Sequence, residues 1–190
     1  MTDDISRRSV ALGLAAGALA PGAALAQQQQ TYSQDEILAA AQRFFGAGAE
    51  GVSTVIEHVF NDHGRPNGYI EGNEGSGAIG VGLRYGDGYL HRKGVSGQSR
   101  VYWQGPSLGF DTGGNAARVF TLVYNLRRTD DIYRRYPGVD GSAYFVGGVG
   151  VNYQERDNVI LAPMRAGVGF RLGANIGYLA YSRRRRLNPF

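Results

Sequence analysis

The chain has 190 residues, including 30 glycines and no cysteine. Its 20 basic and 16 acidic residues give a net charge of +4, and Lys93 is the only lysine, so nearly all of the positive charge comes from arginine. This length suits one domain, and the lack of cysteine excludes disulfide bonds and argues against a structural zinc site.

Residues 1–26 have the pattern of an export signal. Arg7 and Arg8 precede an apolar run over residues 10–19, and Ala24 and Ala26 form a small-x-small cleavage site. The arginine pair fits the twin-arginine route, with the general secretory (Sec) route as the alternative. Because the apolar run is too short to span a bilayer, we expect a periplasmic protein that is not integral to the membrane.

Beyond the signal, the polar residues 27–32 predict a flexible linker, and residues 33–190 predict a single domain. Ser33 and Glu36 have the spacing of a capping box, which marks the start of a helix that we expect to end at Gly46. A second helix with an apolar stripe is expected to end at Gly64. Each helix has one apolar face, so both need an apolar sheet to cover.

The sheet is predicted most clearly by residues 75–89, where apolar side chains alternate with small ones. One face carries Ile79, Val81, Leu83 and Tyr85, and the other carries Ala78, Gly80, Gly82 and Arg84. This alternation predicts a strand over residues 77–85, and Asp87-Gly88 predicts a tight turn after it. Glycine repeated on one face indicates strong curvature, which favours a sheet that closes on itself.

Similar patterns predict further strands near residues 69–71, 89–93, 99–104, 108–111, 119–126, 143–153, 159–161, 167–172 and 177–182. A short helix is expected over residues 130–136. The predicted fold class is therefore mainly β with N-terminal helices, in the form of a small antiparallel β-barrel packed by two helices.

No motif predicts a catalytic site, a metal or a cofactor. Residues 75–80 match the glycine pattern of dinucleotide-binding proteins, but a strand pattern follows instead of a helix, and Arg100 stands where an acidic residue is needed. His58 and His63 are five residues apart, which does not align two metal ligands on a helix. We expect a protein that is not an enzyme.

Two groups of residues are candidates for binding. The first is a run of four arginines, which could contact the phosphates of lipid headgroups or lipopolysaccharide, or could simply be a solvated strand end: Arg183, Arg184, Arg185 and Arg186. The second is an aromatic group, which could line the mouth of a pocket or belong to the core: Tyr102, Trp103 and Phe110. Binding to nucleic acid is disfavoured because the chain carries an export signal.

The sequence also resembles a known family. Residues 69–72 and 75–78, then 82–86, 106–111 with Gly113-Gly114, and 123–126 are similar to the EipA-type envelope-integrity family of alphaproteobacteria. The resemblance covers residues 32–181. It implies a secreted periplasmic protein with a small conical β-barrel and packed helices, needed for cell-envelope integrity, with no catalytic residue.

A more distant similarity, through the glycine-rich strand and residues 107–110, is to the SYLF lipid-binding domain, but the lysine-rich region of that domain has no counterpart here. Two functional hypotheses follow. In the first, the barrel or its rim binds a lipid, an acyl chain or an anionic envelope component. In the second, a filled barrel acts through its surface on the machinery that builds the envelope.

Overall fold

The computed structural model describes residues 30–46, 51–79, 81–107, 115–166 and 177–186. Two helices come first, α1 (Gln34–Phe45) and α2 (Val52–His63). The predicted capping box is confirmed: the Ser33 N–H donates to the Glu36 carboxylate at 2.8 Å, and the Glu36 N–H donates to the Ser33 hydroxyl at 3.2 Å. Gly46 and Gly64, both with positive φ, follow the helices at the predicted positions.

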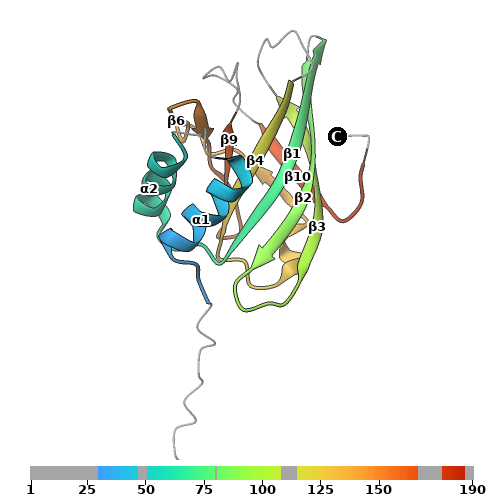
Figure 1. Cartoon of the computed structure of the whole chain (residues 1–190). Coiled ribbons are helices and arrows are strands. Elements are labelled where there is room, and N and C mark those ends of the chain that lie inside the picture. The colour runs from blue at the N-terminus through green and yellow to red at the C-terminus, as the bar shows by residue number, and fades with distance from the viewer. Residues whose placement is uncertain (1–29, 47–50, 80, 108–114, 167–176, 187–190) are drawn as a thin grey trace, which may run out of the picture.

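Ten strands form one antiparallel sheet in the described part of the chain (Figure 1). They are β1 (Gly68–Ile79), β2 (Val81–Arg92), β3 (Gln98–Ser107), β4 (Asn115–Tyr124), β5 (Arg135–Pro137), β6 (Tyr144–Val146), β7 (Val149–Val151), β8 (Gln154–Arg156), β9 (Val159–Ala166) and β10 (Tyr178–Ser182). Their order in the sheet is β5-β10-β3-β2-β1-β4-β9-β7-β6, and β8 also pairs with β9.

The sheet curls until its β5 end approaches β8, the short strand that pairs with β9. Gly138, directly after β5, forms an isolated bridge with Gln154 of β8, and the Val139 N–H donates to the Tyr153 carbonyl at 2.9 Å. Helices α1 and α2 cover one side of the curled sheet (Figure 1). The predicted class is therefore confirmed: a mainly β, barrel-like fold with N-terminal helices.

The chain reverses between β1 and β2 at a different place from the predicted one. Pairing runs without interruption from Gly68 opposite Arg92 to Ile79 opposite Val81, so the predicted strand over 77–85 and the turn at Asp87-Gly88 are wrong. Asp87 and Gly88 lie inside β2 instead. The reason is tertiary: Gly88 is paired with Gly72, and a Cβ on Gly88 would come 2.3 Å from the Glu71 carbonyl oxygen.

The predicted helix over residues 130–136 is also wrong. Only a single 3-10 turn forms, η1 (Thr129–Ile132), and β5 follows it at once. Tyr136 is buried and lies opposite Leu179 of β10, so strand pairing and burial override the local helical signal. The strands expected at 108–111 and 167–172 fall outside the described residues.

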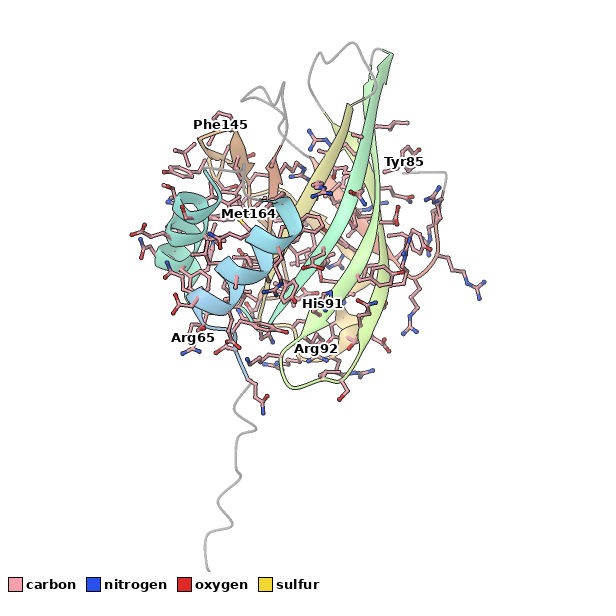
Figure 2. The ribbon with its side chains drawn as sticks, in the orientation of Figure 1. Arg65, Tyr85, His91, Arg92, Phe145 and Met164 are labelled. Atoms are coloured by element: carbon pink, nitrogen blue, oxygen red, sulfur yellow. The ribbon has the colours of Figure 1, made fainter. Side chains whose placement is uncertain are left out.

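Two hydrophobic cores lie on opposite faces of the sheet. The first is between the helices and the sheet, where Met164 lies (Figure 2), and the second fills the inside of the barrel. Strand β4 serves both: Phe120 and Leu122 face the helices, while Val119 and Val123 face the interior. This explains why residues 119–126 are almost all buried, as the sequence predicts.

Lys93 and Tyr32 tie α1 to the sheet. The Lys93 ammonium pairs with Glu36 and lies 4.9 Å from the centre of the Tyr32 ring. The hydrogen bond from Lys93, together with that from Ser33, lowers the pKa of Glu36 to about 2. The Tyr32 N–H donates to the Pro66 carbonyl at 2.8 Å, so the last residue of the expected linker already packs on the domain. None of the helices in the described residues is long and apolar enough to cross a bilayer.

Candidate functional site

Trp103 lies inside the barrel against a row of glycines. Its side chain is only 3% exposed, and β3 places it opposite Gly86 of β2. A Cβ on Gly86 would come 2.1 Å from the indole, and one on Gly72 would come 2.6 Å from it. Because glycine is the residue that leaves this space empty, the inner faces of β1 and β2 can hold the flat indole. The glycine pattern of the sequence thus accommodates an aromatic ring as well as curvature.

Next to the indole is a group of buried charges, which we call the interior charge cluster: Glu74, Arg84 and Arg165. The Arg165 guanidinium donates twice to the Glu74 carboxylate, at 2.9 and 3.1 Å, and the Trp103 indole N–H donates to it at 2.9 Å. Arg84 contacts the same carboxylate at 3.5 Å. Glu74 and Arg165 are 4% and 1% exposed, so the pair is sealed from water.

The cluster keeps Glu74 ionised. Burial alone would raise its pKa, but the Arg165 guanidinium, helped by Arg84 and by the indole hydrogen bond, holds the pKa of Glu74 below its ordinary value. Sequence reasoning missed this pair because its members are 91 residues apart and meet only through the strand register. The available signals were an arginine in the otherwise apolar run of β9, and Glu74 in alternation with Ile70 and Gly72.

A pocket of about 320 Å³ opens on the outer face of the same strands. It is lined by residues 85–87 of β2, residues 102–104 of β3 and residues 185–186 of the segment after β10. Tyr85 lies opposite Gln104, and Asp87 opposite Tyr102, so these four side chains share the face opposite to the Trp103 indole. Figure 2 shows Tyr85 on the part of the molecule that is distant from the helices. We call this site the outer pocket.

The floor of the outer pocket is held in place by an ordered set of contacts. Asp87 forms ion pairs with Arg100 on β3 and, at 3.5 Å, with Arg185. The Arg100 guanidinium in turn lies 4.6 Å from the centre of the Tyr89 ring and 5.3 Å from that of Tyr102. Such cation–π contacts orient the guanidinium and the ring together, so Asp87 and Tyr102 are presented in fixed positions.

The arginine segment, residues 183–186, folds back beside β2 and β3 (Figure 1), and its Arg185 and Arg186 form the wall of the pocket. Arg183 pairs with Asp130 and lies 4.9 Å from the centre of the Tyr133 ring. The Ser182 hydroxyl donates to the Arg184 carbonyl at 2.8 Å. These contacts fix the segment where β10 ends, so the four arginines have different surroundings.

Comparison with known proteins identifies the family. A family model described as envelope integrity protein A matches residues 30–190. The chain belongs to this family. The structure is also similar to the crystal structure of a β-barrel-like, uncharacterized protein from Brucella abortus, with 49% sequence identity, a TM-score of 0.75, and coverage of 84% of this chain and 99% of that one. No curated protein matches the chain.

Membership of the envelope integrity protein A family confirms the resemblance drawn from the sequence and indicates a role in envelope integrity. Among the predicted site residues, Tyr102 and Trp103 line the outer pocket, although the Trp103 indole also belongs to the interior core. Arg185 and Arg186 line it as well, whereas Arg183 and Arg184 do not. Four predicted residues lie outside the described part of the chain, as does Phe110: Arg7, Arg8, Ala24 and Ala26.

The histidines of α2 have structural surroundings. His58 stacks on Tyr144 with ring centres 3.9 Å apart and contacts Asp62 at 3.5 Å. His63 meets the edge of the Tyr153 ring, whose hydroxyl donates to Asp62 at 2.5 Å. Within the ranges that the structure describes, no group of three potential metal ligands comes together.

Proposed function

We propose that this chain is a non-enzymatic periplasmic protein that supports envelope integrity by contacting an anionic envelope component at its outer face. The observation that carries the proposal is the outer pocket, where Arg185 and Arg186 stand over a floor of tyrosines on the surface of the barrel. Arginine side chains recognise phosphate and carboxylate groups through paired hydrogen bonds. The family assignment and the export signal support an envelope location.

The inside of the barrel is a poorer place for a lipid. Side chains from seven strands and from the turn after β4 pack there, including Leu90, Tyr136 and Leu161. The interior charge cluster lies beside them. An acyl chain in this space would have to displace packed side chains or lie against buried charges, and both cost free energy. The packing therefore favours the surface over the interior as the place of contact.

The pocket also supports a binding role over a catalytic one. Asp87 is the carboxylate among the described lining residues, and its oxygens are engaged by Arg100 and Arg185. Acid–base catalysis commonly pairs two titratable groups, and the described lining has no histidine or second carboxylate to act with Asp87.

The proposal is tested by complementation of a strain that lacks the gene, scored as survival in detergent. We expect an Arg185→Ala/Arg186→Ala protein to be made and exported at the normal level but to fail to restore survival. The matched control is Arg127→Ala/Arg128→Ala, which removes the same charge from another exposed arginine pair. Full rescue by the pocket variant, or equal failure of both variants, would contradict a specific role for the outer pocket.

Export and ligand content are tested on protein isolated from the periplasm. We expect N-terminal sequencing to begin at Gln27 and native mass spectrometry to show the mass of residues 27–190 alone. A stoichiometric co-purifying lipid would instead support carriage inside the barrel.

A further inference from the structure

We infer that the outer pocket binds an anionic saccharide, that is, a sugar carrying a carboxylate or phosphate group. The inference rests on the proposed function and names the class of ligand for that same site. Three properties of the lining support it: the positive charge of the arginine segment, the hydrogen-bond acceptor Asp87, and the aromatic surface of the tyrosines.

The charge of the lining requires an anionic group on the ligand. Arg185 and Arg186 are exposed at the pocket, and Asp87 is the opposing charge in the lining. Because Asp87 is already paired with Arg100 from outside the lining, the local balance is positive. A carboxylate or phosphate that enters between the two arginines replaces the weak 3.5 Å contact between Arg185 and Asp87 with a direct pair.

The lining also favours a ligand that carries hydroxyl groups. An ionised carboxylate such as Asp87 can only accept hydrogen bonds. A bare anion brings no donor and is repelled by Asp87, whereas a sugar ring brings several hydroxyl donors next to its charged group. Acidic and basic side chains in one small pocket therefore match a ligand with hydroxyls and a negative charge.

The aromatic part of the lining suits a sugar ring better than an acyl chain. Tyr85 and Tyr102 are diagonal neighbours on the outer face of β2 and β3, and both are half-buried. Aromatic faces pack against the flat C–H faces of sugar rings and leave the phenolic hydroxyls for polar contacts. None of the described lining residues is aliphatic, so the apolar part of the lining comes mainly from aromatic rings. A volume of about 320 Å³ is at the lower end of the range for sites that bind small molecules.

The test is isothermal titration calorimetry of the mature protein, residues 27–190, which measures binding directly and does not depend on the buried Trp103 indole. The probes are tri-galacturonic acid, neutral maltotriose, inorganic phosphate and phosphatidylglycerol vesicles. We expect saturable binding of tri-galacturonic acid at physiological salt, with at least tenfold weaker binding of maltotriose and of phosphate.

Three variants assign the binding to residues. Arg185→Ala/Arg186→Ala is expected to weaken binding of tri-galacturonic acid at least tenfold, and Tyr102→Leu at least threefold. Arg184→Ala removes one positive charge from the arginine segment outside the pocket, and we expect its affinity to stay within twofold of the original. The three arginines are exposed, so these variants keep the fold, which an unchanged thermal midpoint confirms.

Other outcomes overturn the inference. Phosphate binding as tight as that of tri-galacturonic acid would indicate a simple anion site, and equal binding of maltotriose would remove the charge requirement. Association with the vesicles in the absence of saccharide binding would assign the pocket to a lipid headgroup. Saccharide binding without loss of complementation in the Arg185→Ala/Arg186→Ala strain would uphold this site but refute the proposed function.

Discussion

At the scale of single residues, the barrel interior depends on one carboxylate. Glu74 faces both Arg165 and Arg84, and it also accepts the indole hydrogen bond of Trp103. Replacing a complete buried ion pair can be nearly neutral, but removing one partner leaves the other charge buried without compensation. Glu74 is thus the member of the cluster whose loss has the largest consequence, because two guanidinium groups lose their counter-charge together.

Substitution of Glu74 by glutamine is expected to lower the free energy of unfolding by about 3–5 kcal/mol, because glutamine keeps the shape but not the charge. Urea denaturation followed by circular dichroism measures this. The control is Glu71→Gln on the same strand, where a side chain that is 31% exposed contacts His91 at 3.6 Å. The free energy of unfolding of the control should fall by less than about 1 kcal/mol. Equal losses in the two variants would argue against the interior charge cluster as the cause.

The same carboxylate predicts a dependence of stability on pH. The pKa of Glu74 is lower in the folded protein than its ordinary value of 4.5, so the unfolded chain binds the proton more tightly. The stabilisation is therefore fully present above about pH 4.5 and is lost as the pH falls toward the folded-state pKa. Thermal midpoints between pH 6 and pH 3 should fall more steeply for the natural protein than for Glu74→Gln. If the thermal midpoints of the two proteins fell equally with pH, Glu74 would not be the source of the pH dependence.

At the scale of elements, the pairing of β1, β2 and β3 is adjusted to the Trp103 indole. Gly86→Ala is expected to destabilise the protein by roughly 1–3 kcal/mol, because its methyl group would overlap an indole that has no room to move. Gly75→Ala on β1 is a matched control, since a Cβ there meets only the Tyr85 carbonyl oxygen at 3.9 Å. The control should be neutral or slightly stabilising. Thermal unfolding of both variants distinguishes the two positions.

Local patterns predict those elements whose signals lie within a few residues of each other. The Ser33–Glu36 capping box and the apolar stripes define α1 and α2, and alternation defines strands. Local patterns do not predict which strands pair, because pairing depends on contacts between residues that are distant in the sequence. Asp87-Gly88 has the composition of a turn, yet Arg100 on β3 and Gly72 on β1 hold it within a strand.

The candidate site could be predicted only in part for the same reason. The arginine segment and the aromatic pair at 102–103 are visible as separate features of the sequence. That Arg185 and Arg186 lie over Tyr102 follows from the pairing of β10 with β3, which places residues about 80 positions apart side by side. Tyr85 and Asp87 complete the pocket through the β2–β3 register.

At the scale of the whole molecule, stability is expected to be greatest in the middle of the sheet. Strand β1 pairs with β2 over twelve residues and with β4 over nine, and β4 is covered by a core on each face. By contrast, β6 is three residues long and lies at the end of the sheet order. Hydrogen exchange should therefore be slowest in β1 and β4 and much faster in β6. Equal protection of β6 would contradict this gradient.

The position of β10 has a consequence for the timing of folding. It follows all the other described strands in the chain, yet it lies between β3 and β5, and it brings Leu179 and Tyr181 into the interior. Until residues 178–182 have emerged from the ribosome, both neighbouring strands have unpaired edges. The sheet therefore stays open while the chain is being made, and its final pairing forms late. A chain stalled before Tyr178 would present two free strand edges to other chains, which is the usual beginning of aggregation.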